Sequence, residues 1–184
     1  MELIASRAKP TNETSGARAE LIHIPTTRDR DFVDITDRIE DLISRSTIGF
    51  GFVNLQVLHT TAALVLNEHE PLLLSDFDQT LDAIASRRQR YQHDDFARRE
   101  GIAADERVNG HAHCQALLLN PAICLNIVDR RLVLGRWQRL FLVELDGPQA
   151  RTVSAVVIGY PARAARRTTR VSTTEVRFRE ALGR

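Results

Sequence analysis

The sequence has few of the residues that mark several common classes of protein. Among its 184 residues there are two cysteines, Cys114 and Cys124, and one lysine, Lys9. Two cysteines within apolar sequence do not make the disulfide framework of a small secreted protein. No apolar run approaches the roughly 18 residues of a membrane span. The stretch 1–19 lacks the apolar run of a signal peptide, so we expect a cytoplasmic protein with no membrane partner.

Charge and motif content exclude further classes. The net charge is +1, which argues against a surface built to bind nucleic acid. The basic residues are nearly all arginine, which a GC-rich genome explains at least as well as a phosphate-binding role. Seven arginines lie after residue 162, but Phe178 is the one aromatic residue among them, so we do not expect nucleic-acid contact. The sequence also contains no Walker loop, Rossmann glycine pattern, Gly-X-Ser-X-Gly, Cys-X-X-Cys or His-Glu-X-X-His.

What the sequence does contain predicts one globular domain. Apolar residues make up 43%, enough for a sizeable core. Helices are predicted near 34–43, over 71–84 and over 112–119, with Gly49 and Gly51 ending the first helical segment. Strands are predicted over 19–24, 52–58, 62–66, 123–128, 131–134, 139–144 and 152–158. These elements do not alternate as βαβ units, so we expect a compact α+β fold with mixed or antiparallel sheets.

Five of the six histidines fall between His59 and His113, each within two residues of a carboxylate, carboxamide or hydroxyl residue. Histidine is the side chain best suited to proton transfer and metal ligation near neutral pH, so the grouping suggests one shared site. His59 follows an apolar strand, where it projects into a site or, alternatively, bonds to backbone in the core. His93 lies in a charged, irregular segment over 86–108, and the length of that segment indicates function.

The sequence Asn109-Gly110-His111-Ala112-His113 is a sharper signal. His-X-His supplies two metal ligands when the chain is extended or turning, and Gly110 permits this. On a regular helix the two imidazoles would diverge. We therefore expect His93, His111 and His113 to bind a divalent metal, zinc or magnesium, if a metal is used.

Several other residues are candidates for the site, and most of them also have a purely structural interpretation. Glu68 is a general base or a polar residue before a helix, Asp76 is a site residue or a solvated helix residue, and Glu144 is a partner for a histidine. Arg151 is placed to hold an anion such as phosphate. Trp137 stacks on a ligand or packs in the core. Asp146, Gly147 and Pro148 follow Glu144 and are residues typical of turns, so a turn alone accounts for them and no function is needed.

Together, these motifs resemble one family, the YjbQ family, also called the secondary thiamine-phosphate synthase family. The resemblance covers residues 19–160 in order and spacing. The motifs are His59-Thr60-Thr61-Ala62-Ala63, Asn67-Glu68 with Glu70-Pro71, His93-Asp94, Asn109 with His111-Ala112-His113, Leu132 with Leu134-Gly135, Trp137-Gln138 and Glu144-Leu145-Asp146-Gly147-Pro148.

The resemblance implies a YjbQ-like α+β domain over 19–161, between a flexible leader (1–18) and an Arg-rich extension (162–184). It also implies a homotrimer with sites near subunit boundaries and a small phosphorylated metabolite as partner. The activity attached to the family is a weak thiamine-phosphate synthase, which couples hydroxymethylpyrimidine diphosphate to a thiazole phosphate and releases diphosphate. His59, Glu68, Asp76 and Glu144 would then be catalytic, and Asn67, Asn109, Trp137 and Arg151 would bind substrate.

The sequence departs from the family pattern at several positions. The family usually has alanine at Gly110, lysine at Gln115 and arginine at Gln149. It also has Gly-Pro-Ser at 120–122, glycine at Arg130 and threonine at Arg136. Gln115 and Gln149 replace cations that could hold a phosphate. Two hypotheses follow: a thiamine-phosphate synthase, or a trimeric metal- or metabolite-binding protein without turnover.

Overall fold

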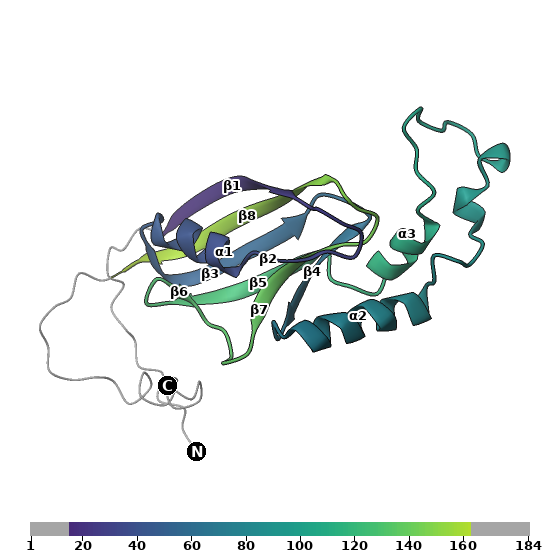
Figure 1. Cartoon of the computed structure of the whole chain (residues 1–184). Coiled ribbons are helices and arrows are strands. Elements are labelled where there is room, and N and C mark those ends of the chain that lie inside the picture. Colours follow the sequence, from purple (N-terminus) through teal and green to yellow (C-terminus); the bar gives the residue numbers. More distant parts are fainter. Residues whose placement is uncertain (1–14, 163–184) are drawn as a thin grey trace, which may run out of the picture.

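The computed structural model describes residues 15–162, which form an α+β fold of antiparallel sheets and helices (Figure 1). The strands are β1 (Gly16–Pro25), β2 (Phe32–Asp34), β3 (Ile48–Val57), β4 (Ala62–Asn67), β5 (Ala122–Val128), β6 (Arg131–Leu132), β7 (Arg139–Glu144) and β8 (Ala150–Pro161). The α-helices are α1 (Thr36–Ser44), α2 (Pro71–Ile84) and α3 (Gly110–Ala116), and two short 3-10 turns are η1 (Gln92–Asp94) and η2 (Phe96–Arg98). The predicted fold class is confirmed.

Two sheets pack face to face. The larger has the order β1-β8-β3-β5-β6 and the smaller has the order β2-β7-β4, with antiparallel pairing throughout. Side chains alternate between the faces of a strand. On β7, Leu140 and Leu142 therefore enter the main core between the sheets, whereas Phe141 and Val143 enter a second core under α2 and α3. The smaller sheet is thus a middle layer, buried on both faces.

The helices form where the sequence provides their spacing and their caps. Ile39, Leu42 and Ile43 of α1 recur on one face and are buried in the main core. At the start of α2, the Glu70 carboxylate accepts hydrogen bonds from the backbone N–H groups of Leu72 and Leu73. Pro71 occupies the first helical position, as expected.

Several boundaries differ from the sequence-based expectation. β1 begins at Gly16, so residues 16–18 belong to the sheet and not to a leader. Gly49 and Gly51 do not end the helix but lie within β3, where a Cβ on Gly51 would meet the carbonyl oxygen of Ile158 at 2.1 Å. β2 was not predicted, because three residues carry too little pattern. The expected leader up to residue 14 and the extension after residue 162 lie outside the described residues.

The connecting segment between α2 and α3 (residues 85–109) lies with these helices at one end of the molecule (Figure 1). It is irregular, as predicted, apart from η1 and η2. The Asp94 carboxylate accepts hydrogen bonds from the N–H groups of Asn109 (3.1 Å) and Gly110 (2.9 Å). Asp94 therefore caps the first turn of α3 and holds the segment against it.

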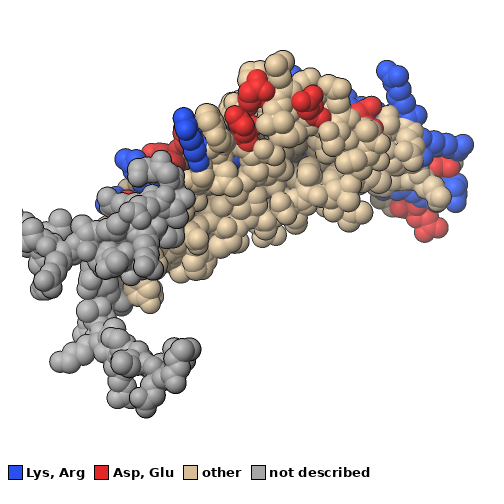
Figure 2. Space-filling view, turned by 90° about the horizontal axis from the view of Figure 1, so that it is seen from below, with Lys and Arg blue, Asp and Glu red and all other residues tan. Residues whose placement is uncertain are grey.

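On the outer face of the larger sheet, the described residues of β1, β8, β3 and β5 include no Lys, Arg, Asp or Glu, whereas Arg131 of the edge strand β6 also lies on this face. The residues that alternate onto this face from β1, β8, β3 and β5 are Ala17, Ala19, Leu21, His23, Thr152, Ser154, Val156, Ile158, Tyr160, Phe50, Phe52, Asn54, Gln56, Cys124 and Asn126. Phe50, Leu21 and Tyr160 are 63%, 56% and 49% exposed. Figure 2 likewise shows a broad uncharged surface with charged side chains along one margin and at its ends. We call this the uncharged face.

Candidate functional site

A buried ion pair fixes the turn that follows β7. Arg151 Nε donates to Glu144 Oε2 at 2.6 Å, and both side chains are almost fully buried. Burial alone would raise the pKa of Glu144, but hydrogen bonds from Arg151 and from the backbone of Gly147 and Asp146 outweigh it and lower this pKa. The guanidinium of Arg151 also donates to Thr61. These partners occupy both side chains, so the pair shapes the turn and does not offer a free cation.

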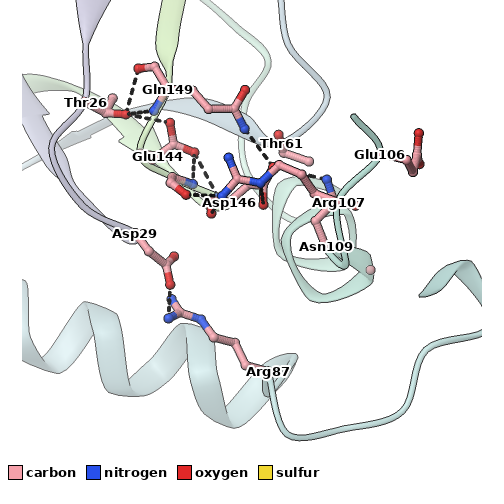
Figure 3. Close-up of polar contacts among 12 residues, drawn as sticks. Thr26, Asp29, Thr61, Arg87, Glu106, Arg107, Asn109, Glu144, Asp146 and Gln149 are labelled. Atoms are coloured by element: carbon pink, nitrogen blue, oxygen red, sulfur yellow. Dashed lines mark hydrogen bonds and ion pairs between the residues drawn. The ribbon is translucent and has the colours of Figure 1, made fainter. Parts of the chain in front are cut away.

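Asp146, the second residue after β7, contacts three side chains (Figure 3). Two of them come from the connecting segment, and the third comes from the turn before β8. Its Oδ2 accepts hydrogen bonds from Asn109 Nδ2 (3.1 Å) and Gln149 Nε2 (2.8 Å). Its Oδ1 lies 3.4 Å from Arg107 Nε, and Arg107 also donates to the carbonyl oxygen of Gly147. Asp146 therefore joins the connecting segment to the sheets.

A polar pocket of about 440 Å³ lies where these parts meet. Its lining consists of hydroxyl, amide, imidazole, guanidinium and carboxylate groups from Thr60, Thr61, His93, Arg99, Asp105, Glu106, Arg107, Asn109, His113, Asp146 and Gln149. The connecting segment supplies the largest share of this lining, and the ends of the strands supply the opposite wall. We call it the His93–His113 pocket. It brings together three residues singled out from the sequence: His93, His113 and Asn109.

The two histidines of the pocket contact each other. Their ring centroids are 4.7 Å apart with the rings at 68°. Burial lowers the pKa of His113, and the neighbouring His93 lowers it further, against the opposite effect of Asp146 and Glu106. The Nε2 atom of His93 is buried, has no hydrogen-bond partner in the described structure and lies 3.7 Å from Glu106 Oε1. The two imidazoles thus line the pocket as one contacting pair.

His59 lies next to the pocket but does not line it. Its Nε2 accepts a hydrogen bond from the backbone N–H of Thr152 at 2.9 Å, which requires a neutral ring with the proton on Nδ1. Burial and the nearby Arg151 both lower the pKa of His59 and favour this neutral form. The backbone contact is the alternative considered from the sequence, and it positions Thr60 and Thr61 in the wall of the pocket.

His111 and His113 do not form the expected pair of metal ligands. Both lie within α3, which begins at Gly110, so their side chains diverge around the helix. His111 is buried outside the pocket lining, and burial together with Arg87 lowers its pKa. Within residues 15–162 there is no group of three or more His, Cys, Asp or Glu residues that could hold a metal ion. The described residues thus do not supply a preformed metal cage.

Four other candidates lie outside the pocket lining: Asn67, Glu68, Asp76 and Trp137. Asn67 accepts a hydrogen bond from the backbone N–H of Glu68, at the end of β4. Trp137 is 60% exposed and packs under the guanidinium of Arg136 at 4.7 Å, so it is not a core residue. Asp76 is exposed on α2. The structure does not bring these four side chains to His93 and His113.

Conversely, sequence reasoning missed most of the charged lining. Arg99, Glu106 and Arg107 come from the connecting segment, for which the only signal was its length. Arg99 Nη1 donates to Glu106 Oε1 (2.9 Å) and to the carbonyl oxygen of His93 (3.0 Å), which fixes this part of the wall. Asp146 was attributed to the turn alone. Both roles hold, because the turn is what points its carboxylate at Asn109.

Comparison with known protein families shows which family this chain belongs to. A model of the YjbQ family, described as UPF0047 protein YjbQ-like, matches residues 20–160. The chain belongs to the YjbQ family. A UPF0047 protein of Methanothermobacter thermautotrophicus is 32% identical over 74% of this chain and 88% of its own length. The UPF0047 protein YugU of Bacillus subtilis is 27% identical over 75% of this chain and 97% of its own length.

Two solved structures share the fold. A YbjQ-like protein of unknown function from Sulfolobus solfataricus has a TM-score of 0.71 and 31% identity, over 79% of this chain and 99% of its own. A conserved hypothetical protein from Thermus thermophilus has a TM-score of 0.60 and 34% identity, over 74% and 97%. The expected family is therefore confirmed. None of the helices in the described part of this chain is long and apolar enough to cross a membrane.

The structure explains two departures from the YjbQ pattern. Gln115 is fully buried, outside the pocket lining, and its Nε2 donates to the carbonyl oxygens of Leu81 (3.1 Å) and Ala85 (2.9 Å). Gln115 therefore provides hydrogen-bond donors for the free backbone carbonyl groups at the C-terminal end of α2. It is not in place to hold a phosphate, contrary to the interpretation from the sequence. At Gly110, an added Cβ would lie 2.5 Å from Tyr91 Cβ, so the close packing of Tyr91 requires glycine.

Proposed function

We propose that this protein binds a small phosphorylated metabolite in the His93–His113 pocket and is a transferase of the thiamine-phosphate synthase type. The supporting observation is that the pocket places two imidazoles beside Arg99, Arg107 and the hydroxyl residues Thr60 and Thr61. Guanidinium, imidazolium and hydroxyl groups are the usual protein partners of phosphate oxygens. Both substrates are water-soluble phosphate esters, consistent with the expected cytoplasmic location.

The reaction requires charge neutralisation more than covalent help from the protein. The bond between the pyrimidine's methylene carbon and the diphosphate oxygen breaks, and that oxygen leaves with the electron pair. The thiazole ring nitrogen forms the new bond to the same carbon. Positive groups at the position of the leaving diphosphate stabilise the transition state. In this proposal Arg99 and Arg107 orient the diphosphate, and an imidazole N–H of His93 or His113 donates a hydrogen bond to it.

The proposed divalent cation, zinc or magnesium, would bind together with the diphosphate. Magnesium is commonly held by one or two carboxylates plus substrate phosphates, and this does not need a preformed cage. Asp105 and Glu106, in the pocket wall, are the carboxylates that would hold the cation, although Glu106 also accepts a hydrogen bond from Arg99. The cation would supply neutralisation of the leaving group's charge.

Turnover of both substrates tests the proposal. Purified protein is incubated with hydroxymethylpyrimidine diphosphate, thiazole phosphate and magnesium, and thiamine phosphate is measured by chromatography. We expect product from the wild type, a loss of at least tenfold in His93→Gln/His113→Gln, and full activity in His69→Gln, which changes an exposed histidine outside the pocket. Equal product from the wild type and the double variant would refute the proposal.

A second candidate, a metabolite-binding protein without turnover, is favoured by the pairing of the two arginines. Arg99 is already bonded to Glu106, and Arg107 to Asp146 and Gly147. Equilibrium binding of thiazole phosphate separates the candidates. Saturable binding that His93→Gln/His113→Gln weakens, with no product from both substrates, would select the binding protein.

The proposed homotrimer uses the uncharged face. Exposed large apolar side chains such as Leu21, Phe50 and Tyr160 are typical of interaction surfaces, and a three-fold ring needs a face that contacts a different surface of the next copy. Light scattering after size exclusion tests this: we expect a trimer that Phe50→Arg dissociates and that Trp137→Arg, at an exposed tryptophan outside this face, leaves intact. A monomeric wild type would refute it.

A further inference from the structure

Two carboxamides in the pocket wall share one hydrogen-bond acceptor. Asp146 Oδ2 accepts from Asn109 Nδ2 at 3.1 Å and from Gln149 Nε2 at 2.8 Å, and all three residues line the pocket (Figure 3). A carboxylate oxygen can only accept, so each amide turns its NH2 group toward Asp146 and its carbonyl oxygen away from it. Because both amides bond to the same atom, they lie side by side.

Backbone contacts hold both amides in this orientation. The N–H of Asn109 donates to Asp94 Oδ1 at 3.1 Å. The N–H of Gln149 donates to Thr26 Oγ1 at 2.8 Å, and its carbonyl oxygen accepts from the N–H of Thr26 at 2.9 Å. Neither amide can turn its NH2 group toward a ligand without breaking its bond to Asp146. A ligand therefore meets two carbonyl oxygens that are already oriented.

The two carbonyl oxygens have no donor among the described residues. Asn109 Oδ1 is buried and lacks a hydrogen-bond partner in that part of the chain. Gln149 Oε1 likewise receives no hydrogen bond from residues 15–162. A buried polar atom without a partner is rare and indicates a missing group. Since both residues line the pocket, the missing group is a hydrogen-bond donor on a ligand.

The charges beside the amides favour an uncharged donor. Arg107 Nε lies 3.4 Å from Asp146 Oδ1, and Arg107 also donates to the carbonyl oxygen of Gly147. This guanidinium balances the carboxylate and would repel a second cation at the amide oxygens. The divalent cation proposed above is held by Asp105 and Glu106 and does not use these oxygens. A phosphate oxygen is disfavoured there as well, because it cannot donate a hydrogen bond to a carbonyl oxygen.

We infer that Asn109 and Gln149 recognise an uncharged amino group, so that the pocket selects a ring bearing this group over the same ring with an oxygen in its place. An amino group on an aromatic ring has two N–H donors, one for each carbonyl oxygen. This recognition rests on the pocket of the proposed function and does not require turnover. Hydroxymethylpyrimidine has its amino group on the ring carbon next to the one that carries the diphosphate-bearing methylene, so the diphosphate would still lie near Arg107.

The test measures binding of the pyrimidine without its diphosphate. Hydroxymethylpyrimidine, and the analogue in which an oxygen replaces the amino group, are titrated into the wild-type protein by calorimetry at pH 8, with EDTA to remove metal ions. We expect saturable binding of the amino compound. We expect binding of the oxygen analogue to be weaker by about tenfold or more, because a site built around a hydrogen bond rejects a ligand that cannot make it.

Variants at Gln149 test which residue reads the amino group. Gln149→Leu removes one acceptor and should weaken binding of hydroxymethylpyrimidine by about tenfold. Gln138→Leu changes an exposed glutamine outside the pocket lining and should leave the affinity unchanged. Gln149→Arg replaces the acceptor with a donor, so it should weaken binding of hydroxymethylpyrimidine while strengthening binding of inorganic diphosphate. Damage to the fold would weaken both.

The comparison of the two compounds uses the wild type alone, so it remains decisive if a variant does not fold. Equal affinity for the two compounds, no binding of hydroxymethylpyrimidine, binding that requires magnesium, or an unchanged affinity in folded Gln149→Leu would each overturn the inference. Amino-dependent binding without thiamine phosphate formation would refute the proposed activity alone. Thiamine phosphate formation with equal binding of the two compounds would refute the recognition of the amino group alone.

Discussion

Asn109 donates its side-chain amide to Asp146, and this contact joins the start of α3 to the turn after β7. Asp146 is an acceptor, so the orientation of the Asn109 amide follows, with Nδ2 toward the carboxylate. Residues 37 positions apart are thereby held together in the wall of the pocket.

The Asp146→Asn variant should lose stability. The carboxylate is buried, accepts two side-chain hydrogen bonds and pairs with Arg107, so we expect a loss of about 1–3 kcal/mol in the free energy of unfolding. Urea denaturation measures this. The matched control is Asp41→Asn, which breaks the exposed pair with Arg45 and should cost far less, because exposed ion pairs are screened by water. Equal losses in the two variants would contradict the central role of Asp146.

The Glu144→Gln variant should be more severe, because it leaves the buried guanidinium of Arg151 without a counter-charge. Breaking a buried ion pair from one side costs about 3–5 kcal/mol. The lowered pKa of Glu144 also gives a pH signature. Its stabilisation is complete above the unfolded value of 4.5 and is lost as the pH falls through the lower folded value. Thermal unfolding between pH 3 and 5 should therefore be less pH-dependent in the variant.

The buried His111 and the half-buried His59 and His113 predict a separate pH window. Burial lowers the pKa of His59, His111 and His113 below 6.5, so the unfolded chain binds protons more readily than the folded one. Their contribution is present above pH 6.5 and is lost as the pH falls through the folded values. We expect the Tm to fall between pH 7 and 5, and His111→Gln to reduce that fall. A Tm independent of pH over this range would show that these rings stay solvated.

The Gly110→Ala variant tests the packing of the connecting segment. The new Cβ would lie 2.5 Å from Tyr91 Cβ, so Tyr91 must shift, and overpacking of this kind costs about 1–3 kcal/mol. Gly135→Ala is the control, because its Cβ would meet Gln138 at an ordinary 3.4 Å. Chemical denaturation compares the two. A Gly110→Ala protein as stable as Gly135→Ala would show that Tyr91 has room to move.

The Gln149→Arg variant tests the charge of the pocket. Gln149 lines the pocket beside Asp146. The lining has two arginines, Arg99 and Arg107, and three carboxylates, from Asp105, Glu106 and Asp146, so an added arginine would balance these charges. A charge-assisted hydrogen bond is worth about 1.5–3 kcal/mol, so we expect at least a tenfold tighter dissociation constant for inorganic diphosphate by calorimetry. Gln138→Arg, outside the pocket lining, should leave the affinity unchanged. No gain in Gln149→Arg would argue against anion binding beside Asp146.

Much of the fold could be predicted because local pattern determines it. The run over α2, from Pro71 to Ile84, and the apolar run of β7 were predicted with the observed bounds, since caps and periodicity mark them. β2 was not, because its three residues become a strand by pairing with β7. The site was harder. His93 and His113 are 20 residues apart and meet through η1 and the cap at Asp94, which no local pattern encodes.

The same limit explains the expectations that the structure does not support. His-X-His predicts ligation from spacing, but the helix that contains it turns the rings apart. Arg151 has the side chain of a phosphate ligand, yet its burial with Glu144 removes it from the pocket. Residue type indicated the chemistry, whereas burial and pairing decided which side chains remain available for it.

The connecting segment contributes His93, Arg99, Asp105, Glu106 and Arg107 to the pocket, although it contains no strand and few buried apolar residues. The two cores that stabilise the sheets lie elsewhere, so ligand preference and folding stability reside in different parts of the chain. Substitutions in the pocket-lining part of this segment are therefore expected to change which ligands the pocket accepts, while the packing of the two sheets stays as it is.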